Sequence, residues 1–228
     1  MKILIIFRGM NARVRTGIHD QGTQTQDALN CITNWAISIF KPLREAHITY
    51  DIILITYPSS SLETLVSLLH PIKVVTEGYS SRDENMAVAS RYMTDYQQCY
   101  DRFLMLRFDL KYRVSITKWP KWHEKGLIIV NRDRHWPSVG GFKYFTADML
   151  FVVDRESVND FYKALNCEHQ RAGHSVGRYL HEHHISYHLM YHEYYNMFEH
   201  PLHAMDQFEE EPVVDGVYIA HVQEPIYT

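Results

Sequence analysis

Residues 100–111 read Tyr-Asp-Arg-Phe-Leu-Met-Leu-Arg-Phe-Asp-Leu-Lys, an apolar run that ends in charged residues. Its centre, residues 103–106, lacks the polar alternation of a strand with one face in water, so it predicts a strand buried on both faces. Arg107 and Asp109 stand two apart, and on an extended chain their side chains point to the same side. Ligands bind outside the carboxyl ends of strands in open α/β sheets. The pattern indicates a nucleotide or metal site at Asp109; the alternative is an ordinary ion pair with Arg107.

Length and composition are those of a globular protein. The chain has 228 residues, of which 46% are hydrophobic and 22% charged, enough for a sizeable core in one large domain or, as the alternative, two small ones. The formal net charge of −4 creates no broad positive field. We therefore expect neither a nucleic-acid partner nor attraction to an anionic bilayer.

Cysteine usage and hydropathy indicate an intracellular location. Cys31, Cys99 and Cys167 are odd in number and far apart, which predicts neither a disulfide framework nor a zinc knuckle. The apolar opening segment stops at Arg8, and no run approaches the roughly 20 apolar residues that cross a bilayer. We expect a soluble, cytoplasmic protein with no transmembrane segment.

Short apolar runs alternate with segments of helical periodicity. The runs predict strands over residues 3–7, 50–57, 72–76, 103–106, 127–130, 149–153 and 217–222. The periodic segments predict helices over residues 27–43, 62–69, 79–98 and 156–165, the first with Asp27 as its cap and with Pro42 near its end. Residues 10–26 read as a polar loop, and residues 185–192 fit a strand or a helix. The alternation implies an α/β fold with a mainly parallel sheet flanked by helices.

Histidines gather in the last third of the chain. The run from His181 to Ile185 lacks the final histidine of an HExxH motif, so a zincin site is absent. His184, His188 and His192 would share one face if this segment were helical. Most of these side chains are best interpreted as surface or hydrogen-bonding residues, with a histidine-bound metal protein as the alternative.

Several nucleotide and hydrolase motifs are missing. The chain has no GxGxxG after its first strand, no GxxxxGK[ST] and no GxSxG. These gaps remove the main sequence support for a dinucleotide-binding protein, a P-loop enzyme and an α/β-hydrolase. What remains is an α/β sheet with an arginine after the first strand and a carboxylate ending a central strand.

The order of elements over residues 1–155, together with residues 104–110, resembles the nucleotide-sugar-binding half of small GT-A-type glycosyltransferases, including those of large DNA viruses and bacteria. The resemblance implies a single GT-A-like domain over residues 1–228. Its nucleotide-sugar-binding half would be residues 1–112 and its acceptor-side half residues 113–228. The implied activity is transfer of a hexose or pentose from a nucleotide-diphosphate sugar to a glycan, a glycoprotein or another hydroxyl acceptor.

In that family a central strand ends in a DxD motif whose last Asp binds a divalent cation on the donor diphosphate. Asp109 matches that residue, while Arg107 stands where the first Asp is expected, so a guanidinium is available to neutralise the diphosphate directly. The resemblance implies Mn²⁺ or Mg²⁺ at Asp109, with a second ligand from near the C-terminus, for which His192 is our choice over His188. The residues expected to bind the donor are Phe7, Arg8, Gly9, Asp83, Asn85, Arg107, Phe108 and Asp109; for Asp83 and Asn85 the alternative is helix capping.

An inverting transferase of this kind also needs a carboxylate base for the acceptor hydroxyl. Asp148 is the first candidate for the catalytic base, because it follows the Gly140-Gly141 loop and precedes a strand, and Asp133 is the second. Capping of a strand or helix is the alternative for Asp148. The departure at Arg107 also keeps open a non-catalytic nucleotide- or glycan-binding module of the same fold.

Overall fold

The structure is a computed structural model of the full 228-residue chain. It describes residues 1–9, 11–15, 24–76, 82–108, 110–112, 114–130, 146, 150–167, 176–190 and 219–221.

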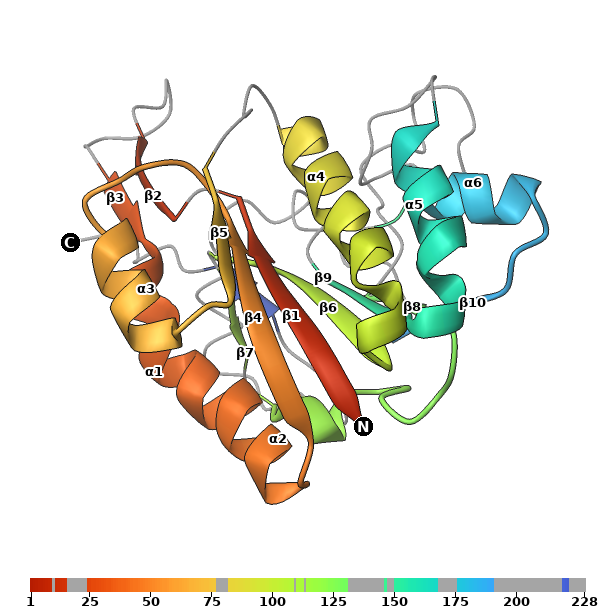
Figure 1. The fold of residues 1–228 in the computed structure, drawn as a ribbon, viewed down its shortest axis with the longest axis horizontal. Coiled ribbons are helices and arrows are strands. Elements are labelled where there is room, and N and C mark those ends of the chain that lie inside the picture. The colour runs from red at the N-terminus through yellow and green to blue at the C-terminus, as the bar shows by residue number, and fades with distance from the viewer. Residues whose placement is uncertain are drawn as a thin grey trace.

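A seven-stranded sheet forms the centre of the molecule (Figure 1). Its strands are β1 (Lys2–Arg8), β4 (Thr49–Ile55), β5 (Lys73–Val75), β6 (Arg102–Arg107), β8 (Leu127–Ile129), β9 (Leu150–Asp154) and β10 (Tyr187–Leu189). The order across the sheet is β10-β8-β9-β6-β1-β4-β5. Four of the neighbouring pairs are parallel, and β9 runs antiparallel to both β6 and β8. The predicted α/β class with a mostly parallel sheet is confirmed.

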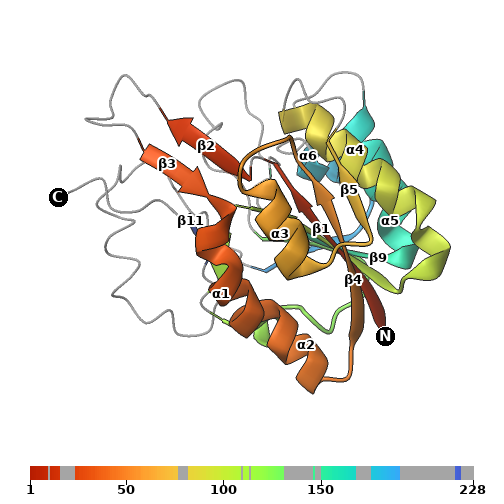
Figure 2. The same cartoon turned by 60° about the vertical axis from the view of Figure 1, so that its left-hand side comes forward.

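Helices cover both faces of the sheet, as Figures 1 and 2 show from two directions. One face carries α1 (Ile32–Trp35), a π-helical turn (Ala36–Phe40), α2 (Lys41–Glu45) and α3 (Leu62–Leu69). The other carries α4 (Arg82–Asp95), α5 (Val158–Asn166) and α6 (Val176–Glu182). Short 3₁₀ turns lie at Ala28–Cys31, Gln97–Cys99, Ile116–Lys118 and Arg155–Ser157.

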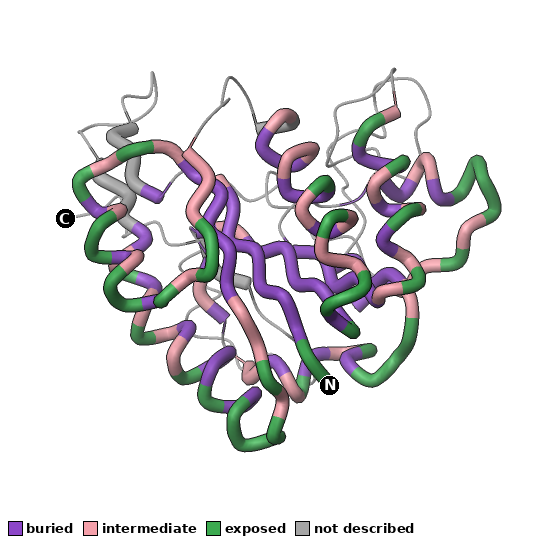
Figure 3. The backbone as a smooth tube through the Cα atoms, in the orientation of Figure 1, coloured by how far each residue is buried: buried purple, intermediate pink, exposed green. Residues whose placement is uncertain are grey.

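Alternation along the central strands divides the core into two layers. In β1, Ile3, Ile5 and Phe7 pack in the cluster beneath α1, α2 and α3, whereas Leu4 and Ile6 pack in the cluster beneath α4, α5 and α6. Because both faces are covered, β1 is buried from its second residue onward, which explains its uninterrupted apolar sequence (Figure 3).

One prediction near the N-terminus was wrong. Within residues 10–26, expected to be a loop, β2 (Ala12–Arg15) pairs antiparallel with β3 (Gln24–Asp27). Asp27 ends β3, and the helix that follows it is continuous from Ala28 to Glu45 and passes through Pro42. The π-helical turn just before Pro42 widens the helix, and this relieves the clash that a proline ring makes with the preceding turn.

Farther along the chain, residues 187–189 form strand β10, which resolves the open choice between strand and helix there. The predicted strand at 217–222 is confirmed in part as β11 (Ile219–His221). It does not join the main sheet but pairs antiparallel with β7 (Leu110–Tyr112), a strand that the sequence did not predict. Residues 219–221 therefore pair with the strand that begins directly after Asp109 in the sequence.

Two further expectations concern the described residues. The three cysteines form no disulfide bond. None of the described helices combines the length and the apolar character that spanning a membrane requires.

Candidate functional site

The order of the strands reverses at β1. From β1 the chain moves to β4 and β5 on one side and then returns to β6 on the other side of β1. In open α/β sheets such a reversal leaves a crevice outside the carboxyl ends of the two diverging strands, and ligands bind there. The register pairs Arg8 with Arg107, so the last residues of β1 and β6 lie side by side at this position.

Both arginines belong to the α4 side of the sheet. Phe7 and Phe108 pack in the α1 layer, and Leu106 does so as well, so Arg8 and Arg107 alternate to the opposite face. The Arg8 side chain is buried, with 2% exposed, and Arg107 is partly exposed. Two guanidinium groups therefore start from neighbouring backbone positions on one face. Guanidinium forks match the geometry of phosphate oxygens.

The backbone after Arg8 is fixed by hydrogen bonds to the end of β4. Gly9 has a φ of +102°, a conformation that residues with a side chain rarely adopt. The N–H of Gly9 donates to the carbonyl of Ile55 at 3.1 Å, and the Thr56 hydroxyl donates to the carbonyl of Gly9 at 2.8 Å. Gly9 thus lets the chain turn at the carboxyl end of β1, where the sequence predicted a ligand.

Two buried amides flank this turn. The Asn85 side chain, in the first turns of α4, donates from Nδ2 to the carbonyl of Ile55 at 3.3 Å. The Asn11 side chain donates from Nδ2 to the carbonyl of Tyr57 at 3.5 Å. Their exposed fractions are 4% and 0%, and the Oδ1 atom of each has no hydrogen-bond partner in the described part of the chain. Buried acceptors without a donor are costly, which makes both oxygens suited to N–H or O–H groups of a ligand.

Asn85 was expected at this site from the sequence, but Asn11 was not. An asparagine in a polar loop carries no distinguishing pattern, and its burial depends on contacts with residues about 46 positions away along the chain. Asp83 lies in the first turn of the same helix as Asn85, and the structure does not describe its side chain.

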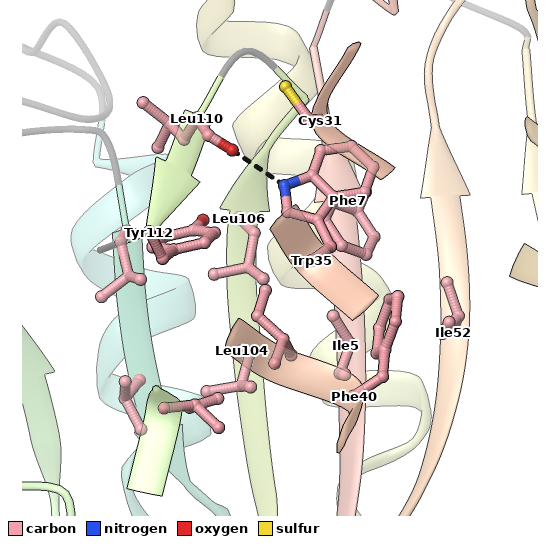
Figure 4. Packing of buried hydrophobic residues seen from close by; sticks show 14 of the residues in the cluster. Ile5, Phe7, Cys31, Trp35, Phe40, Ile52, Leu104, Leu106, Leu110 and Tyr112 are labelled. Carbon is pink, nitrogen blue, oxygen red and sulfur yellow. Dashed lines mark hydrogen bonds between the residues drawn. The ribbon is translucent and has the colours of Figure 1, made fainter. Parts of the chain in front are cut away.

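Phe7 and Phe108 also were expected at the site. Their side chains are 0% and 1% exposed and stack on each other with ring centroids 5.8 Å apart. Both contact the Trp35 ring, at 4.4 Å and 6.3 Å between centroids (Figure 4 labels Phe7 and Trp35). They hold the ends of β1 and β6 against α1, and direct contact with a ligand stays a prediction.

Four predicted residues, Asp109, Asp133, Asp148 and His192, lie outside the described residues. Among the residues that are described, no group of three or more His, Cys, Asp or Glu side chains is arranged to hold a metal ion.

The pairing of β7 with β11 adds a further histidine to the candidates for a metal ligand. It places the backbone of His221 opposite Leu110, next in sequence to Asp109. No local pattern distinguishes His221 among the fifteen histidines, because only the long-range strand register brings it opposite Leu110.

No protein-family model and no curated protein sequence matches the chain. Similar solved structures include a protein assigned as a nucleotide-diphospho-sugar transferase from Desulfovibrio desulfuricans, with a TM-score of 0.47 and 12% identity over 82% of this chain and 78% of that one. Another is a mutant of Drosophila β-1,4-galactosyltransferase 7 in complex with manganese, UDP-Gal and xylobiose. Its TM-score is 0.46 and its identity 10%, over 98% of this chain and 71% of that one. Both scores lie below 0.5, and the proposals below rest on the geometry of this chain.

Proposed function

We propose that the protein is a glycosyltransferase that uses a nucleotide-diphosphate sugar, with the donor bound at the carboxyl ends of β1 and β6. The observation that carries the proposal is the register of Arg8 with Arg107 at the reversal of strand order, beside the buried acceptor oxygens of Asn11 and Asn85. Such a combination suits a ligand with a diphosphate at one end and N–H or O–H donors at the other.

The chemistry of transfer explains why cationic groups belong here. As the sugar leaves, negative charge grows on the diphosphate, and preorganised donors that face this charge lower the barrier. Arg8 and Arg107 supply such donors from fixed strand ends. In this proposal the oxygens of Asn11 and Asn85 accept hydrogen bonds from the base or the ribose, and Asp83, two residues before Asn85 in the sequence, is a further donor-binding residue.

Asp109 stands two residues after Arg107, the last residue of β6, and its carboxylate oxygen suits Mn²⁺ or Mg²⁺. The imidazole of His192 or His221 would be a further ligand of Mn²⁺. Such a cation, when bound, supplies additional positive charge on the diphosphate. Arg107 stands where the DxD motif has its first Asp, so its guanidinium supplies part of this positive charge.

Asp148 is the proposed base that takes the proton of an acceptor hydroxyl, and Asp133 is the second candidate. A carboxylate accepts this proton as the oxygen attacks the anomeric carbon. The acceptor in this proposal is a glycan or a glycoprotein.

Calorimetric titration with a panel of sugar nucleotides, with and without Mn²⁺, tests the proposal together with assays of donor hydrolysis and transfer. We expect a donor to bind, Arg107→Ala to weaken it about tenfold or more through loss of a charge-assisted hydrogen bond, and Asp109→Asn to abolish turnover while the fold is kept. Arg91→Ala, at an exposed position on α4, is the matched control and should change neither property.

Each negative result has a definite meaning. Wild-type protein that binds no sugar nucleotide in either condition would sink the proposal. Binding without hydrolysis or transfer to any acceptor would favour the non-catalytic binding module. Unchanged turnover in Asp109→Asn would remove Asp109 from the site.

A further inference from the structure

Two neighbouring residues of α1, Asn34 and Trp35, hydrogen bond to the strand that follows Asp109. Asn34 Nδ2 donates to the carbonyl of Tyr112 at 2.8 Å, and the Tyr112 N–H donates to Asn34 Oδ1 at 2.6 Å. Trp35 Nε1 donates to the carbonyl of Leu110 at 2.8 Å (Figure 4). Along this edge of β7, helix side chains occupy the place that a neighbouring strand would otherwise take.

The opposite edge of β7 is held as well. Backbone groups of alternate residues in a strand point to opposite edges, and the bonds to α1 involve Leu110 and Tyr112. Between them, Lys111 is in register with Ala220 of β11. β7 is therefore fixed between the first helix and the C-terminal segment.

Both side chains are themselves fixed. The Ser38 hydroxyl, buried one turn later, donates to the carbonyl of Asn34 at 2.6 Å and lies 3.2 Å from Asn34 Oδ1. Trp35 is fully buried, and its ring packs against Phe7 and Phe108. Neither side chain needs to be ordered when a ligand binds, which is the requirement for a preorganised site.

The two residues that flank Asp109 in the sequence thus both contact Trp35: Phe108 by ring packing and Leu110 by a hydrogen bond. We infer that Asn34 and Trp35 are positioning residues that hold the chain on both sides of Asp109 and thereby serve binding of the donor diphosphate. The ligand named in this inference rests on the proposed function, whereas the holding of residues 108–112 by α1 does not.

The test compares Asn34→Ala and Trp35→Phe with the wild type. Trp35→Phe keeps an aromatic ring in the core but removes the N–H donor together with part of the ring volume, and Thr33→Ala, at the exposed neighbouring position, is the control. In Asn34→Ala the Tyr112 amide should exchange with solvent about tenfold faster, because it loses its acceptor, while amides of β1 keep their rates. The donor KM should rise about three- to tenfold in both variants and stay unchanged in Thr33→Ala.

Unchanged exchange at Tyr112 in Asn34→Ala would overturn the inference. Faster exchange with an unchanged donor KM would overturn it too, because the pair would then be merely structural. If the wild type binds no sugar nucleotide, the proposed function fails, and the ¹³C shift of the Asp109 carboxyl group decides the inference. A change in that shift in Asn34→Ala, with none at the exposed control Asp95, supports it, and no change overturns it.

Discussion

At the amino end of the central sheet, buried polar groups are matched with one another. Arg102 begins β6, and its Nε lies 2.5 Å from Asp154 Oδ1 at the end of the antiparallel β9. Its other nitrogens donate to the carbonyls of Trp122 and Glu124, and the second Asp154 oxygen accepts the N–H of Gly126 at 2.9 Å. At the carboxyl end, Asn11 and Asn85 each keep a buried oxygen without a partner among the described residues.

Under the proposed function, this difference separates an end of the sheet that stabilises the fold from an end that binds a ligand. Matched buried groups stabilise a fold, whereas an unmatched buried acceptor costs stability and is retained where a ligand supplies the missing donor. Substitutions at the amino end should therefore change the free energy of unfolding and leave binding intact. Substitutions at the carboxyl end should instead weaken binding and leave the free energy of unfolding nearly unchanged.

The largest effect is expected at the buried ion pair. Asp154→Ala leaves the Arg102 charge buried without its carboxylate, and it should lower the free energy of unfolding by about 3–5 kcal/mol. Urea denaturation followed by tryptophan fluorescence measures the loss. Replacing both partners with apolar residues, as Arg102→Met with Asp154→Leu, should restore most of the stability, because no unpaired charge is left.

An exposed ion pair provides the control. Glu182→Ala breaks the Arg178–Glu182 pair on α6, whose side chains are 33% and 46% exposed, and should cost about 0.5 kcal/mol or less. Suppose that Asp154→Ala lowered the free energy of unfolding no more than Glu182→Ala does. The buried ion pair would then not stabilise the amino end, and the proposed difference between the two ends would be wrong.

The second effect concerns Asn85 at the carboxyl end. Asn85→Leu removes an unmatched acceptor, and the carbonyl of Ile55 that loses the Asn85 donor still accepts the N–H of Gly9. The free energy of unfolding should change by less than about 1 kcal/mol, while donor affinity falls about tenfold through one lost buried hydrogen bond. Denaturation and calorimetric titration of the same variant measure both quantities.

Asn166→Leu on α5 is the matched control, since Asn166 is also a helix amide but bonds to Ser90 and Tyr162, away from the turn at Gly9. Donor affinity should not respond to it. Should Asn85→Leu lower stability by more than about 2 kcal/mol with affinity kept, Asn85 would be an ordinary core amide.

Local patterns were enough to predict most of the sheet. The strands β1, β4 and β6 were predicted because strands covered on both faces are continuously apolar. The antiparallel direction of β9 was not, because its five residues are equally apolar whichever way the strand runs. The hairpin of β2 and β3 and the strand β7 were missed, because they lack such a run and form through pairing with distant or polar partners.

The candidate site shows the same limit. Arg8, Arg107 and Asn85 were expected together from the positions of strand ends and a helix start, and the structure brings all three to one edge of the sheet. Asn11 and the Asn34–Trp35 pair were not expected. Their roles arise from hydrogen bonds that span 46 to 78 residues, which no local pattern encodes.

The smallest effect is expected at Asp51, and its pH dependence sharpens the comparison. Burial raises the pKa of this carboxyl group, but hydrogen bonds from Lys2 and Tyr100 outweigh burial and hold the pKa below its usual value. A carboxylate with a lowered pKa stabilises the folded state above its unfolded pKa and loses that contribution as the pH falls through the folded value. Asp51→Asn should therefore cost about 1 kcal/mol or less at pH 7, and the difference from wild type should shrink progressively as the pH falls below about 4.

Urea denaturation between pH 7 and pH 3 measures this difference, with Glu63→Gln, at an exposed position on α3, as a control expected to show no comparable trend. A difference that stays constant down to pH 3 would show that the carboxylate form of Asp51 is not what stabilises the amino end. Donor affinity at pH 7 should be equal in Asp51→Asn and wild type. Asp51 lies at the opposite end of β4 from Ile55, so its charge acts on stability alone if the two ends are independent.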